Sequence, residues 1–215
     1  MRSALFRAAT FTVAFGSLAA AAALAPTPAF AQNAQAANPA SAFVNDNMHK
    51  GLEILNNKSL SVEQRRVQFE GFLLGLTDMK RIAAFTLGQY RRGASQADQD
   101  AFGNAFQNYA VAVYQSYFAK YAGQTLRVVN SQERAPGDFI VTTEMNSPND
   151  RTGQPLEVDF RVRTDGPKPV VVDMSVAGIW LAIEERDQFT SFLGQNNGDI
   201  KLLIQYLSDL AKQFK

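Results

Sequence analysis

The spacing of apolar residues in the first half of the chain predicts four helices. Between positions 40 and 123, apolar side chains recur at intervals of three and four residues, which places them on one helix face. Ser61, Asp78 and Ser95 stand where a helix N-cap is expected. We expect helices over about 40–56, 61–76, 78–88 and 95–123. The longest carries an apolar and aromatic stripe of Phe102, Phe106, Tyr109, Val113, Tyr117 and Tyr121.

The apolar period shortens to two residues after Gly123, which is typical of strands. Alternating segments at 126–128, 139–145, 156–163 and 170–176 are separated by turns such as Pro136-Gly137 and Asp165-Gly166. The simplest assembly is a four-stranded antiparallel meander with one apolar face. Two more helices, around 184–193 and from Asp199 onward, close the chain. The predicted fold is a single α+β domain with helices packed on the apolar face of the sheet.

Residues 1–31 have the pattern of a secretory signal peptide. Arg2 and Arg7 form a basic start, an apolar run follows, and Ala29-Phe30-Ala31 is a small-residue cleavage site. An uncleaved membrane anchor is the alternative, but the run is alanine-rich and falls short of the roughly 20 residues that span a bilayer. We therefore expect an exported protein with a signal peptide at 1–31, a flexible tail at 32–39 and one domain at 40–215.

Charge and composition exclude several classes of function. Removal of Arg2 and Arg7 with the signal peptide leaves 19 basic and 20 acidic groups, too balanced for electrostatic binding of nucleic acid. The chain has no cysteine, which excludes disulfides, Cys-ligated metals, thiol catalysis and a lipoprotein anchor. The single histidine, His49, falls near the polar side of the first predicted helix, and we interpret it as a surface residue.

No catalytic motif emerges from the sequence. The chain contains no HExxH, no glycine-rich phosphate loop and no GxSxG. Glu184, Glu185 and Asp187 are interpreted as a solvated helix start favoured by the helix dipole. The alternating charges of residues 157–163 indicate an exposed strand face or a partner surface. Ser175 and Ser191 have no candidate base, so we expect no enzymatic activity, no catalytic residue and no metal site.

Large apolar residues are the strongest positive signal. The chain has 16 phenylalanines, and a set of apolar side chains could converge between the helices and the sheet. An ordinary core explains such a set on composition alone, and a ligand cavity would need the same residues held apart. The set comprises Phe72, Leu73, Met79, Ile82, Phe106, Tyr109, Val113, Phe139, Val141, Phe160, Val162, Val172 and Met174. The two-residue period of the strands predicts that Phe160, Val162, Val172 and Met174 share the inner face of the sheet, opposite the aromatic stripe of the longest helix.

The segment DMSVAGIWLAIEERDQF at 173–189 resembles a stretch of the MlaC family of toluene-tolerance, or phospholipid-binding ABC-transporter auxiliary, proteins. LGQYR at 87–91 and the aromatic helix of 102–121 also resemble family elements. The residues that match in type and spacing are Asp173, Gly178, Leu181, Arg186 and Phe189. The departures are Ala177 for the usual Glu, Trp180 for Ser, Glu184-Glu185 for Asn-Tyr, and Lys168-Pro169 for Trp-Lys.

The resemblance implies a periplasmic carrier that holds phospholipid acyl chains in a cavity between a curved sheet and helices. The apolar set above, together with Trp180, would then bind lipid, and phospholipid would be cargo with no cofactor needed. The implied partners are an inner-membrane ABC transporter with an MCE-domain ring and an outer-membrane lipoprotein–porin complex, which together maintain the lipid asymmetry of the outer membrane. Two alternatives stay open: a carrier of hopanoid or another apolar lipid, and an exported protein-interaction module without ligand that acts through residues 157–163.

Overall fold

The computed structural model describes residues 38–118, 121, 123–148 and 153–214, and all of them belong to one compact unit. The predicted signal peptide and cleavage site at 1–31 and most of the predicted tail lie outside the described residues. The longest helix ends at Phe118, so the prediction that it continues through Tyr121 to Gly123 is wrong.

Helices form where the sequence predicts them. Ser61 and Gln64 form a reciprocal capping box at the start of one helix, and the Asp78 carboxylate accepts from the Arg81 backbone N–H at the start of the next. The Ser95 hydroxyl accepts from the backbone N–H of Asp98. The helices are α1 (Pro39–Asn56), α2 (Val62–Leu76), α3 (Met79–Thr86), the 3-10 helix η1 (Gly88–Gly93), α4 (Gln96–Phe118), α5 (Leu181–Gln195) and α6 (Ile200–Gln213).

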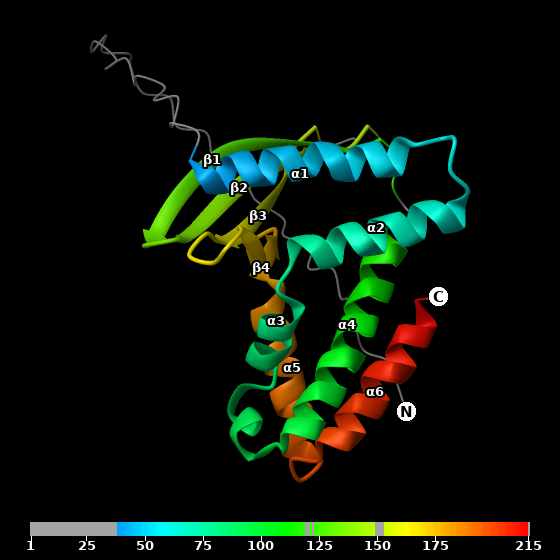
Figure 1. Cartoon of the computed structure of the whole chain (residues 1–215), viewed down its shortest axis with the longest axis vertical. Helices are drawn as coiled ribbons and strands as arrows, with labels where there is room; N and C mark the ends of the chain where they lie inside the picture. The colour runs from blue at the N-terminus through cyan, green and yellow to red at the C-terminus, as the bar shows by residue number, and fades with distance from the viewer. Residues whose placement is uncertain (1–37, 119–120, 122, 149–152, 215) are drawn as a thin grey trace, which may run out of the picture. The chain divides into compact units, whose positions relative to one another are not determined.

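The sheet is an antiparallel meander, which confirms the predicted topology (Figure 1). Its strands follow in the order β1-β2-β3-β4-β5, so each strand pairs with its neighbour in the sequence. A short fifth strand joins the four predicted ones through a turn at Ala177 and Gly178, both at positive φ. The strands are β1 (Thr125–Ala135), β2 (Asp138–Asn146), β3 (Leu156–Arg163), β4 (Val170–Val176) and β5 (Ile179–Trp180).

A bulge in β4 changes the predicted register. Met174 lies opposite Phe160, but Val171 rather than Val172 lies opposite Val162. Val172 is therefore the extra residue of the bulge, which interrupts the two-residue alternation of β4. That Val172 shares an inner face with Met174 and Val162 stays a prediction. Residues 170–172 are all valine, so a shift of the strand by one residue places a valine at the same position opposite β3. No polar residue in this segment favours one register over the other.

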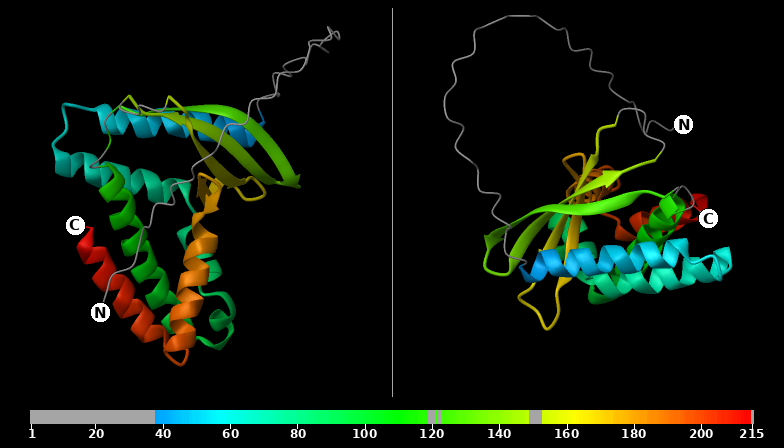
Figure 2. Two further views of the ribbon diagram at one scale, coloured as in Figure 1. Left: turned by 180° about the vertical axis from the view of Figure 1, so that it is seen from behind. Right: turned by 90° about the horizontal axis from the view of Figure 1, so that it is seen from above.

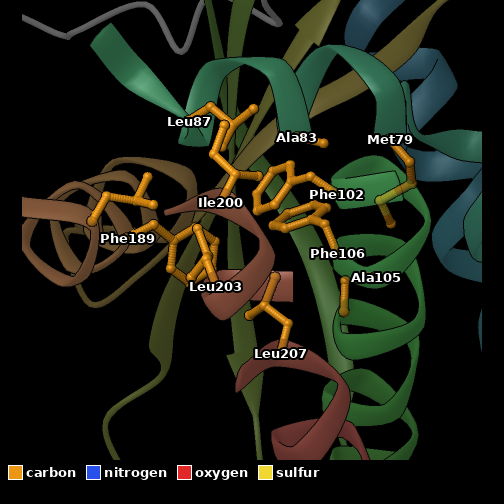
Figure 3. Close-up of a cluster of buried hydrophobic side chains, with 12 residues drawn as sticks. Met79, Ala83, Leu87, Phe102, Ala105, Phe106, Phe189, Ile200, Leu203 and Leu207 are labelled. Atoms are coloured by element: carbon orange, nitrogen blue, oxygen red, sulfur yellow. The ribbon is translucent and has the colours of Figure 1, made fainter. Parts of the chain in front are cut away.

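One apolar core lies among the helices α3, α4, α5 and α6 (Figure 3). The rings of Phe102, Phe106 and Phe189 contact one another with centroids 6.1 to 6.3 Å apart. Leu203 and Leu207 of α6 are fully buried in this cluster. The aromatic stripe predicted for the longest helix is thus used largely to join helices to one another.

A second core lies between α1 and the sheet. Ala40 and Val44 of α1 are buried against Phe139, Val141 and Val162. Figure 2 shows α1 running along the sheet with α2 beside it, in agreement with the contacts between these elements. We had expected the aromatic stripe of α4 opposite this face, and α1 covers it instead, because its small residues allow close approach to the strands. None of the helices in the described part of the chain combines the length and apolar character needed to cross a membrane.

Candidate functional site

The structure divides the predicted apolar site residues between two clusters that have no residue in common. Met79, Ile82, Phe106 and Tyr109 belong to or pack against the helical cluster. Phe139, Val141, Phe160 and Val162 belong to or pack against the sheet cluster. The remaining predicted residues are partly buried and belong to neither cluster: Phe72, Leu73, Val113, Val172, Met174 and Trp180.

Helix α2 connects the two regions. It packs against α1, which covers the sheet, and against α4, which belongs to the helical bundle. The Phe72 ring lies so close to α1 that a Cβ added at Gly51 would meet it at 3.2 Å. On the side of α4, the Gln115 amide donates to the Glu70 carboxylate at 3.4 Å. Helix α2 therefore contacts both regions, although Val62 and Val67 in its first half are exposed.

Large apolar side chains at the borders of both clusters remain partly exposed. If all of these side chains packed into one continuous core, most of them would be fully buried, because the interiors of proteins are closely packed and exclude water. The arrangement leaves apolar surface available to a ligand. The border residues are Leu74, Ile82, Tyr109 and Tyr114 in the helical cluster, and Phe43, Met48, Val128, Phe160 and Val171 in the sheet cluster.

A hollow of about 450 Å³, hereafter the basic hollow, lies between the α2–α3 junction and the β3–β4 hairpin. Lys168 of the hairpin donates from Nζ to the Gly75 carbonyl at 3.0 Å, and the Asp78 N–H donates to the Val171 carbonyl at 3.4 Å. These bonds hold the hairpin over the junction. The hollow is lined by Leu74, Thr77, Asp78, Met79, Lys80, Arg81, Gln107, Arg163, Asp165, Gly166, Pro167, Lys168 and Val170.

A second hollow of about 330 Å³ is lined by outward-facing residues of the sheet together with Trp180 and Ile183. Arg161 and Arg134 contribute cations to its wall. Arg161 donates to both carboxylate oxygens of Asp138, at 3.0 and 2.8 Å, and this bond holds the pKa of Asp138 below its usual value. One member of the predicted charged face, Arg161 of β3, therefore forms an ion pair with Asp138 of the neighbouring strand β2.

Two carboxyl groups lie close together where β4 meets the start of α5: Asp173 of β4 is buried and Glu185 of α5 is partly buried. Asp173 Oδ1 accepts from the N–H groups of Met174 and Ala182 at 2.8 and 3.0 Å, which fixes the first turn of α5 to β4. Burial raises the pKa of Asp173, and burial together with the Asp173 charge raises the pKa of Glu185 to about 8. Our interpretation of Glu185 as part of a solvated helix start is wrong, because its side chain is partly withdrawn from water and close to Asp173 of β4. Glu184 is exposed, as predicted.

The described residues bring together no catalytic or metal-binding group. No three His, Asp or Glu side chains converge as possible metal ligands in this part of the chain. His49 is exposed on α1. Ser175 is fully buried, and its hydroxyl finds no hydrogen-bond partner among the described atoms. The candidate site is therefore the apolar surface between the two clusters, with the basic hollow beside it.

Comparison with known proteins identifies the family of the chain and a solved structure with a similar fold. A family model described as MlaC protein matches residues 45–209, most of the chain, and the protein belongs to the MlaC family. Its fold is similar to that of the phospholipid-binding protein from Ralstonia solanacearum, which was solved in complex with a phospholipid. The TM-score is 0.66 at 20% sequence identity, and the match covers 82% of this chain and 96% of that one.

Proposed function

We propose that this protein is a periplasmic carrier of phospholipid. It would serve as the soluble component of an Mla-type ABC transporter system and exchange lipid with an outer-membrane lipoprotein–porin complex and an inner-membrane MCE-domain transporter. Membership of the MlaC family supports the proposal, as does the structural neighbour, whose own complex contains a phospholipid. The signal-peptide pattern at 1–31 supports export.

The observation that carries the proposal is the pair of separate apolar clusters with partly exposed borders. Each buried CH₂ group is worth about 0.8 kcal/mol, so a 16-carbon chain in water represents on the order of 12 kcal/mol. A carrier must cover that apolar length with protein side chains and needs few polar contacts to do so. Under this proposal, partly buried side chains such as Phe72, Phe160 and Met174 would provide such cover.

Mass spectrometry of the protein purified from the periplasm tests the proposal. Under native conditions we expect a mass increase that equals bound phospholipid, and under denaturing conditions a chain that begins at Gln32. Lipid extraction then identifies the cargo, because phospholipid and hopanoid differ in mass and in the presence of phosphorus. A protein that carries no lipid from the periplasm, and takes none from vesicles, would instead be an interaction module.

A further inference from the structure

The basic hollow has an excess of positive charge, whereas the whole chain is nearly neutral. Four cationic side chains and two carboxylates line it, whereas basic and acidic groups are nearly balanced over the whole sequence. The cations come from α3, the end of β3 and the β3–β4 hairpin: Lys80, Arg81, Arg163 and Lys168.

Both carboxylates of the hollow already have partners. Asp78 Oδ1 accepts from the backbone N–H of Arg81 at 3.0 Å and caps α3. Asp165 is paired with Arg163. Among the described residues, the side chains of Lys80, Arg81 and Lys168 form no ion pair. Lys168 Nζ donates one hydrogen bond to the Gly75 carbonyl, and an ammonium group has two further N–H donors. Lys80, Arg81 and Lys168 therefore retain donors for an anion.

The base of the hollow is apolar and adjoins both clusters. Leu74 and Met79 belong to or pack against the helical cluster. Val170 precedes Val171, which packs against the sheet cluster. The lining of the hollow thus combines four cationic side chains with residues that belong to, or adjoin, the two apolar clusters. Its volume of about 450 Å³ is sufficient for a small polar group and the start of an apolar chain.

We propose that the basic hollow binds the phosphate of the carried lipid through Lys80, Arg81 and Lys168. The inference rests on the proposed function, because it assumes that a lipid occupies the apolar surface. Lysine and arginine donate charge-assisted hydrogen bonds to phosphate oxygens. A phosphatidylglycerol headgroup retains the full negative charge of its phosphate, whereas the ammonium of phosphatidylethanolamine offsets it. The hollow therefore favours lipids with a net negative headgroup.

Lipid exchange from mixed vesicles tests the proposal. The purified protein is incubated with vesicles of equal phosphatidylglycerol and phosphatidylethanolamine, recovered, and its lipids are quantified. We expect wild-type protein to be enriched in phosphatidylglycerol on the order of threefold, a ratio typical of exposed charge pairs. The triple variant Lys80→Gln, Arg81→Gln, Lys168→Gln should return to the vesicle ratio with the same total lipid per protein.

A charge-matched control separates local binding from net charge. Lys50, Arg92 and Lys201 are exposed and lie outside the basic hollow, so their replacement by glutamine should leave the enrichment unchanged. Lys80→Arg with Lys168→Arg should also preserve it. The proposal is overturned if wild-type protein takes the two lipids equally, or if the triple variant stays enriched. Failure of every protein to take up lipid would refute the carrier function itself.

Free phosphate offers the same chemistry as the lipid headgroup, and one further arm distinguishes them. Inorganic phosphate is added during exchange and compared with chloride at equal ionic strength, because salt alone weakens exposed contacts. The bound acyl chains keep the phosphate of the lipid close to the hollow at high effective concentration, so free phosphate should compete with it poorly. The enrichment measured in added inorganic phosphate should therefore equal that measured in chloride. Loss of enrichment with phosphate alone would assign the hollow to the free ion and overturn the proposal.

Discussion

At the residue scale, Asp173 and Glu185 show how carboxyl groups support the junction of sheet and helix. Asp173 is 8% exposed and receives two backbone N–H groups, which compensate part of the loss of water. Glu185 has no such compensation, and the raised pKa of about 8 means that it is largely protonated at neutral pH. An uncharged Glu185 avoids repulsion from the Asp173 carboxylate and lets α5 pack close to β4.

We predict that Glu185 makes the protein less stable as the pH rises. Its pKa in the folded state, about 8, exceeds the ordinary value of 4.5, so folding is favoured at low pH and the stabilisation is lost between these values. Glu185→Gln removes the ionisation. At pH 8 the variant should be more stable than wild type by on the order of 1–3 kcal/mol, with little difference at pH 4.5, as measured by urea unfolding.

Glu184 is the matched control, since it is exposed on the same turn of α5. Glu184→Gln should leave the pH dependence of unfolding as in wild type. The prediction would be contradicted if Glu185→Gln and Glu184→Gln changed the pH dependence of the unfolding free energy by the same amount. Such a result would show that Glu185 ionises freely in the folded protein.

At the scale of elements, the contact between η1 and α5 depends on a glycine. Gly88 has a φ of +54°, and a Cβ there would lie 2.8 Å from the Thr190 methyl group. Gly71 sits inside α2 with no neighbouring atom within 4 Å of such a Cβ. We predict that Gly88→Ala destabilises by about 1–3 kcal/mol. Gly71→Ala should stabilise by about 0.5–1 kcal/mol through helix propensity. Urea unfolding of both variants measures the contrast, and equal effects would contradict the close η1–α5 contact.

Local signals explain why the elements could be predicted from the sequence. Ser61, Asp78, Ser95 and Asp199 are helix caps whose hydrogen bonds reach only two or three residues along the chain. Strict alternation in residues 156–163 likewise defines a strand from neighbouring positions. The register of β4 could not be predicted, because it depends on which of three similar valines meets Val162.

Contacts between distant elements explain what the sequence could not predict about the candidate site. The identity of the apolar residues was available from their periodicity, but their division into two clusters depends on α1 covering the sheet. The basic hollow unites Lys80 and Lys168, which are far apart in sequence and carry no motif. The burial of Glu185 follows from the packing of α5 on β4, and a charged pair at a helix start gives no sign of it.

At the scale of the whole molecule, the carrier hypothesis depends on unfilled space beside the two cores. Met174 lies opposite Phe160 in the sheet, is partly buried, and belongs to neither cluster. It is therefore a suitable position at which to ask whether added volume displaces a ligand or strains a packed interior.

We predict that Met174→Trp lowers the amount of bound lipid several-fold and changes the melting temperature little, because the indole occupies space that acyl chains otherwise fill. In a filled core the same substitution would overpack and cost about 1–3 kcal/mol. Val62→Trp is the control, since Val62 is 74% exposed at the start of α2 and should affect neither property. Lipid extraction and thermal unfolding of the same samples decide the matter. A strongly destabilised Met174→Trp, with a wild type that carries no lipid, would mean that the interior is filled and the protein is no carrier.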